Sequence, residues 1–276
     1  MADHIPSIVE SEQQNLQNCL NILGLTAKLV DDVDTLYGDL LERSKAGDPD
    51  FNSEDRHRAV VALLHLLTFC RRQLSIGAVT LFRGNSRDSL VHLRGAIDAA
   101  AISWRISKHH TLASIWLSAG RDKESHNLYR KHFDPRALYP EKQHLDYNRS
   151  LRTLYDKAYD LSSKVLHASV YGVAPHASVR AVTPDDSEAA GKPVAIELHF
   201  CDIKKEELLA PTLVHVLKAH LRILDVLMHG FEECGCPVPS ETRASFALIE
   251  ERIGRHREKW KLGNPQAKGQ GGEIPL

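Results

Sequence analysis

The sequence predicts a mainly α fold, a multi-helix bundle with one inserted β-hairpin. Apolar residues recur every three or four positions through most of the 276 residues, which is the period of an amphipathic helix. Residues 194–200 instead alternate apolar and polar side chains, and that period of two indicates a half-buried strand. Because helical segments heavily outnumber strands, we expect a helical bundle with a small β appendage.

The first half of the chain predicts consecutive amphipathic helices joined by short loops. Residues 5–43 form one long apolar repeat, which Gly24 weakens in its middle. Ser53 is placed to cap the next helix, because its hydroxyl can accept a hydrogen bond from a free backbone N–H at a helix start. Gly84 is placed to end that helix. Further helices are expected to begin at residues 86, 111 and 121.

The second half predicts three more helices around the hairpin. A weaker strand at 177–182 and a polar connector precede the strand at 194–200, so the hairpin spans about 177–200. A hairpin this small does not stand alone, and we expect it to lie on the helices. The chain therefore reads as a single helical domain over 1–262, followed by a Gly-rich tail at 263–276 that we expect to be disordered. The helices expected here span residues 147–168, 204–234 and 240–260.

Composition narrows the classes of function. The chain has 35 basic and 36 acidic residues, which removes the general electrostatic argument for a nucleic-acid partner but leaves room for a local basic face. The start lacks the pattern of a secretory signal, and the longest apolar run is too short to cross a bilayer. Five scattered cysteines are typical of reduced thiols. We expect a cytoplasmic protein with no membrane partner.

Metal and cofactor motifs are missing from the sequence. His229, Cys234 and Cys236 fall close together, but Cys-x-Cys lacks the two-residue gap common in zinc sites, and no second ligand pair follows. Neither a phosphate-binding glycine loop nor a nucleophile-elbow motif occurs. We therefore expect no metal and no cofactor.

Two residues on the third helix form the first candidate site. Arg94 and Asp98 are one helical turn apart, and Arg94 shares a stripe with apolar residues that face the core. One interpretation is a structural ion pair, because a buried guanidinium needs a partner. The other is that Arg94 faces a cleft and binds a phosphate or carboxylate with its planar fork of donors.

The helix at 147–168 carries the second candidate site. Tyr159, Ser163 and His167 are spaced by four residues and share a face, with Ser162 beside them. A hydroxyl one turn before a histidine can orient its imidazole. The alternatives are a functional His167 on a cavity wall, where the helix ends, and a histidine with satisfied hydrogen bonds inside the core.

These two motifs resemble an uncharacterised bacterial family of HEPN-like all-helical proteins. That family pairs a helix of the form Leu-Arg-x3-acidic with a later Tyr-x2-Ser-x4-His helix, matched here by Leu93, Arg94 and Asp98 and then by Tyr159, Ser162 and His167. The resemblance covers about residues 55–170. It implies a helical bundle, often a homodimer, in a superfamily that includes metal-independent ribonucleases with an Arg-x4-6-His motif. Lys164 but no arginine lies in the six positions before His167, and Arg87–His92 is a match on the third helix.

Two functions follow as hypotheses. In the first, the protein is a metal-independent ribonuclease or nucleotide-processing component of a bacterial defence or stress system. His167 then acts as acid or base, Arg94 holds a phosphate, and RNA or a nucleotide is the partner. In the second, it is a non-catalytic helical module that binds a small anionic ligand or a partner protein. Arg94, Asp98, Tyr159 and His167 would then form a polar pocket or only a buried polar network, and Ser162 and Ser163 are further candidates for binding.

Overall fold

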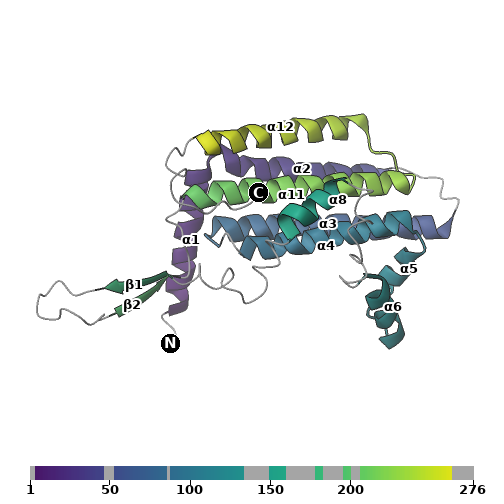
Figure 1. Ribbon diagram of the computed structural model, residues 1–276, viewed down its shortest axis with the longest axis horizontal. Coiled ribbons are helices and arrows are strands. Elements are labelled where there is room, and N and C mark those ends of the chain that lie inside the picture. The colour runs from purple at the N-terminus through teal and green to yellow at the C-terminus, as the bar shows by residue number, and fades with distance from the viewer. Residues whose placement is uncertain are drawn as a thin grey trace, which may run out of the picture.

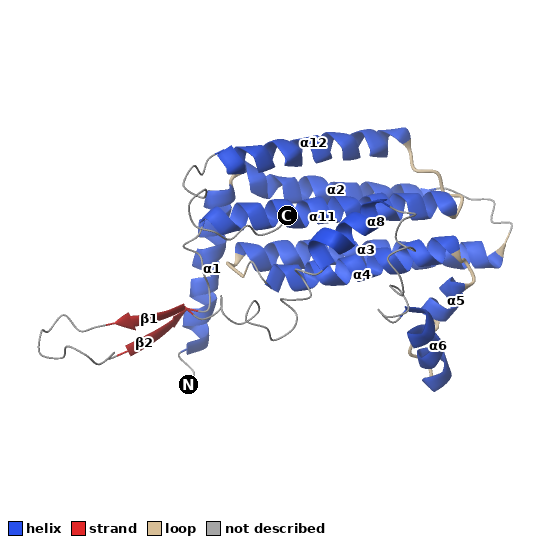
Figure 2. Cartoon of the chain, viewed as in Figure 1, coloured by secondary structure: helices blue, strands red, loops and turns tan. Residues whose placement is uncertain are grey.

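A computed structural model of the chain describes residues 4–46, 53–85, 88–133, 149–159, 178–182, 195–199 and 206–262. It confirms the predicted multi-helix bundle: the long helices lie side by side, α1 crosses one end, and α5 and α6 extend from the other (Figures 1 and 2). The elements in chain order are α1 (His4–Leu23), α2 (Leu25–Ala46), α3 (Glu54–Phe82), α4 (Asp88–Lys108), α5 (Leu112–Leu117), α6 (Lys123–Phe133), α8 (Arg149–Leu154), the π-helical turn η2 (Tyr155–Tyr159), β1 (Ser178–Val182), β2 (Ala195–His199), α11 (Glu206–Glu233) and α12 (Ser240–Leu262).

The prediction of one helix over residues 5–43 is wrong, because the chain turns at Gly24 and forms α1 and α2. Gly24 has a φ of 49°, in the left-handed region that residues with a side chain adopt at a cost. Its backbone N–H donates to the carbonyl of Leu20 at 2.9 Å, which closes α1. The apolar repeat runs through this break, so periodicity alone did not reveal it.

Helix α3 begins and ends where local chemistry predicted. The backbone N–H of Arg56 donates to Ser53 Oγ at 3.2 Å, which makes Ser53 the N-cap. Glu54 and Asp55 in the first turn suit the positive end of the helix dipole. After Phe82 the chain leaves the helix, and Gly84 takes a φ of 91°.

Helix α3 is also the one described helix long and apolar enough to cross a membrane by length and composition alone. Its inner face packs against α2, α4 and α11. Side chains such as Leu63, Leu67 and Leu74 are fully buried there. That arrangement is the pattern of a core helix in a bundle, and a single such helix is weak evidence for a membrane span.

A buried polar pair lies at the centre of the bundle. Tyr37 on α2 and His220 on α11 are both completely inaccessible, and the Tyr37 hydroxyl lies 2.9 Å from His220 Nδ1. Burial lowers the pKa of His220 to about 3 and raises the pKa of Tyr37 well above its usual range. Both side chains are therefore neutral at pH 7, and their mutual hydrogen bond offsets the cost of removing them from water.

Strands β1 and β2 pair antiparallel, with Val179 opposite Leu198. The expectation that they lie on the helices is not met, because they extend away from the bundle beside α1 (Figure 1). The predicted tail at 263–276 lies outside the described residues.

The buried histidine predicts how stability depends on pH. Because folding lowers the pKa of His220, the unfolded chain binds more protons between about pH 3 and 6.5, and the free energy of unfolding falls as pH falls through that window. Replacing His220→Gln should reduce the slope of unfolding free energy against pH by about 1.4 kcal/mol per pH unit between pH 6 and 4. Urea denaturation at successive pH values measures this slope.

The matched control replaces the exposed His126 on α6, which removes a histidine without opening the core. His126→Gln should keep the slope of the parent protein. An unchanged slope in His220→Gln would show that His220 does not stay neutral in the fold.

Candidate functional site

Helix α11 is buried around most of its circumference but carries one line of polar side chains. His215, Lys218, Arg222 and Asp225 follow one another at intervals of three or four residues, so they share one face of the helix. This face turns toward α8 and α12, which pack against α11, and residues of η2 line the same pocket. The line is the starting point of the site.

Two contacts fix the neighbouring helices on this face. Ser150 Oγ of α8 donates to Asp225 Oδ2 at 2.5 Å. About one helical turn before Asp225 on α11, Arg222 pairs with Glu250 of α12 at 2.8 Å. These contacts join the three elements at the Asp225 end of the line. The remaining part of the line, around His215 and Lys218, lies beside an open pocket.

The pocket has a volume of about 510 Å³ and lies between α8 with η2, α11 and α12. This volume is within the range that small-molecule sites occupy. Its floor is aliphatic and belongs to the core of the bundle. The floor side chains, each at most 5% exposed, are Leu154, Ala158, Val214, Ala219 and Leu221.

The rim of the pocket is basic. Lys157 of η2, Lys218 of α11 and Arg257 of α12 reach it from three elements, and the Arg222–Glu250 pair completes it. These four cations and one carboxylate give the described rim a formal charge of +3, in a chain whose net charge is -1. Within the described part of the chain, neither Lys157 nor Arg257 has an ion-pair partner. The rim therefore attracts anions.

His215 lies between the floor and the rim. Desolvation by burial lowers its pKa to about 4, and the positive charge of Lys218 adds to the shift. Its Nε2 atom is shielded from solvent and has no hydrogen-bond partner among the described residues. The imidazole is neutral at pH 7, so the rim charge comes from the lysines and arginines.

Gly254 of α12 keeps one wall of the pocket open. A Cβ atom built at this position would meet nothing within 4 Å, so a larger side chain would extend into empty space. At Gly230 of α11, by contrast, a Cβ atom would lie 3.1 Å from Leu63 Cδ2. Gly254 is thus a position where the pocket can be filled without displacing the core.

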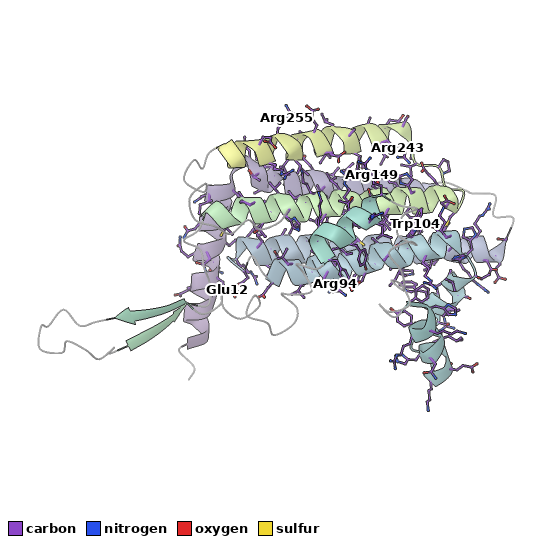
Figure 3. The ribbon with its side chains drawn as sticks, in the orientation of Figure 1. Glu12, Arg94, Trp104, Arg149, Arg243 and Arg255 are labelled. Atoms are coloured by element: carbon purple, nitrogen blue, oxygen red, sulfur yellow. The ribbon has the colours of Figure 1, made fainter. Side chains whose placement is uncertain are left out.

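Arg94 and Tyr159 meet on another side of η2. The Arg94 guanidinium donates from Nε to Asp98 Oδ2 at 3.1 Å and from a terminal nitrogen to the Tyr159 hydroxyl. Its carbon also lies 3.5 Å from the centre of the Tyr159 ring, which Tyr155 stacks on at 4.4 Å. Arg94 is only 13% exposed and is already engaged on both sides. Figure 3 shows it on α4, next to η2.

The pocket and this cluster share η2 but not their side chains. Lys157 and Ala158 line the pocket, whereas Tyr159 contacts Arg94, and Arg94 does not line the pocket. A π-helical turn widens the backbone by one residue per turn, and such turns are frequent at functional sites. The predicted regular helix over 147–168 missed this turn.

Of the predicted site residues, the structure brings Arg94, Asp98 and Tyr159 together. Ser162, Ser163 and His167 lie outside the described residues. The sequence interpretation missed His215, Lys218, Arg222 and Arg257. The line of polar side chains on the mostly apolar helix α11 could have revealed the first three, but no pattern in the sequence marked Arg257 on α12. No cluster of three or more metal-ligating side chains occurs in the described ranges.

Comparisons of the chain with protein-family models, with curated proteins and with solved structures find no match.

The contacts of Arg94 predict a structural role that stability measurements can check. Arg94→Ala removes a guanidinium that pairs with Asp98 and packs on Tyr159, and it should lower the free energy of unfolding by about 1–3 kcal/mol. Asp98 is 32% exposed, so water screens the change below the ~3–5 kcal/mol seen when one member of a fully buried pair is removed. Chemical denaturation measures the difference.

Arg72→Ala on α3 is the matched control, because Arg72 is exposed. It should change stability by no more than about 0.5 kcal/mol. If Arg94→Ala unfolds at the same denaturant concentration as Arg72→Ala, the structural role of Arg94 is wrong.

Proposed function

We propose that the protein is a cytoplasmic helical module that binds a small organic anion in the pocket between η2, α11 and α12. The observation that carries this proposal is the rim charge of +3 in a chain of net charge -1. Arg222 is paired with Glu250, whereas Lys157 and Arg257 have no ion-pair partner among the described residues, so an anion at the rim would compensate their charge. A binding role accounts for several cations placed beside an apolar floor.

Binding is a better account of the pocket than nucleophilic catalysis. Thr153 supplies the hydroxyl group in the described lining, and that hydroxyl donates to the Arg149 carbonyl at 2.8 Å. An activated nucleophile instead needs a general base within hydrogen-bond reach. His215 has no such contact, since its Nε2 atom is buried without a partner among the described residues.

A fluorescent aromatic anion tests this proposal directly. Anilinonaphthalene sulfonate should bind the folded protein saturably, at one site per chain. Arg257→Gln removes one rim charge, so the dissociation constant should rise about tenfold, or ~1.4 kcal/mol. Gly254→Phe fills the pocket and should abolish binding. Fluorescence titration gives both values.

Two matched variants control for general effects. Arg255→Gln removes a charge on α12 that points away from the bundle (Figure 3), and Gly254→Ala adds only a methyl group to the same position. Both should bind the probe nearly as the parent protein does. The proposal is wrong if Gly254→Phe binds as well as the parent, or if Arg257→Gln and Arg255→Gln weaken binding equally.

A second candidate is the ribonuclease of the HEPN-like resemblance. The contact between Arg94 and Tyr159 favours it, because this contact joins the two helices that carry the family motifs. In this proposal His167 is the acid or base and Arg94 holds a phosphate of RNA. The prior engagement of Arg94 by Asp98 and Tyr159 makes this the weaker candidate.

This candidate predicts RNA cleavage that survives EDTA and is lost in His167→Ala. A labelled RNA incubated with the parent and the variant measures the loss, and His126→Ala on the exposed face of α6 is the control. Equal cleavage by His167→Ala and His126→Ala would remove His167 from the mechanism. Absence of cleavage by the parent protein would contradict the ribonuclease candidate.

A further inference from the structure

We infer that the ligand of the pocket is an amphiphilic phosphate: an aliphatic chain that lies on the floor and a phosphate head that lies at the rim. This inference rests on the proposed anion-binding function and narrows it to a chemical class. It follows from how the apolar and charged lining groups are separated, from what the lining lacks, and from the size of the rim charge.

The floor and rim divide the pocket by depth. Leu154 and Leu221 are each 1% exposed and belong to the core, whereas Lys157 is exposed and Arg257 is half-buried. A ligand that contacts both the aliphatic floor and the basic rim needs an apolar part that points inward and an anionic part that stays near water. The methylene stems of the lysines and arginine extend the apolar wall up to the charged groups.

The lining also lacks the groups that recognise a nucleobase. Proteins commonly hold bases by stacking them on aromatic rings and by pairing amide side chains with their edges. No aromatic ring other than the His215 imidazole, and no Asn or Gln, lines the described pocket. The Nε2 atom of His215 is shielded from solvent. An aliphatic body therefore fits this floor better than a purine or pyrimidine.

The rim charge points to phosphate rather than carboxylate. A monocarboxylate carries one negative charge and would leave most of the formal charge of +3 uncompensated. A phosphate monoester carries about 1.5 to 2 negative charges near pH 7 and offers three acceptor oxygens. Lys157 and Arg257, which have no ion-pair partner among the described residues, reach the rim from two different elements and can donate to a head group with several acceptor oxygens.

Displacement of bound anilinonaphthalene sulfonate by hexyl, octyl and decyl phosphate tests this inference, with each compound kept below the concentration at which it forms micelles. Affinity should rise roughly threefold to fourfold for each added methylene until the pocket is full. Decanol, which lacks the charge, should bind at least tenfold more weakly than decyl phosphate. Arg257→Gln should reduce the difference in affinity between decyl phosphate and decanol, whereas Arg255→Gln should leave this difference unchanged.

Two further competitors make the result specific. AMP and inorganic phosphate should fail to displace the probe at concentrations where decyl phosphate displaces it fully. The inference is overturned if AMP competes as well as decyl phosphate, or if chain length has no effect. Either of these two results would contradict the inference about the ligand class but would not contradict the proposed anion-binding function. Failure of the probe itself to bind, or binding that Gly254→Phe leaves intact, would overturn the function and the inference together.

The same phosphate head group occurs on soluble alkyl phosphates and on membrane lipids. A vesicle sedimentation assay distinguishes these two kinds of ligand. Vesicles of phosphatidylcholine with and without phosphatidic acid are spun down with the protein. We expect the protein to remain in the supernatant, because the ligand inferred for the pocket is a soluble phosphate with one aliphatic chain. Sedimentation with phosphatidic acid vesicles, together with no displacement by monomeric alkyl phosphates, would show that the pocket recognises a lipid surface instead.

Discussion

The arrangement of the bundle depends on one constraint: α11 is buried on most sides, although one of its faces carries polar and charged side chains. Leu213, Leu217 and Leu224 lie in the core, while Lys218 and Arg222 on the same helix need solvent or a partner. At the Asp225 end of this face, Ser150 of α8 donates to Asp225 and Glu250 of α12 pairs with Arg222. These contacts hold α8 and α12 against α11. Lys218 instead lines the open pocket, together with Lys157 and Arg257.

The π-helical turn η2 gives one short segment two functions in this arrangement. Its aromatic side chains stack on each other and on Arg94, which anchors the segment to α4. Its Lys157 and Ala158 meanwhile contribute to the pocket beside α11. A regular helix would rotate these side chains relative to one another, so the wider turn allows both contacts at once. The position of Lys157 at the rim is therefore coupled to the packing of Arg94.

Local features were predictable from sequence, and features that join distant segments were not. Ser53 caps α3 because a hydroxyl at that position has a clear chemical role, and the sequence shows it. The contact of Arg94 with Asp98 follows from helical spacing alone. The break at Gly24 depends on a backbone angle that the apolar repeat does not report. The pocket was missed because its walls come from η2, α11 and α12, and the lining residues of these elements are far apart in the chain.

The two arginines of the candidate sites show how geometry decides between roles that residue type leaves open. Arg94 and Arg257 have the same planar donors, and sequence alone favoured Arg94 because it belongs to a motif. In the structure Arg94 is 13% exposed, and its donors already serve Asp98 and Tyr159. An anion could reach it only by displacing a carboxylate, which costs much of the free energy that binding would provide. Arg257 faces a pocket and has no ion-pair partner among the described residues, so an incoming anion displaces only water. The availability of the guanidinium, rather than its place in a motif, favours Arg257 over Arg94 for the proposed binding of an anion.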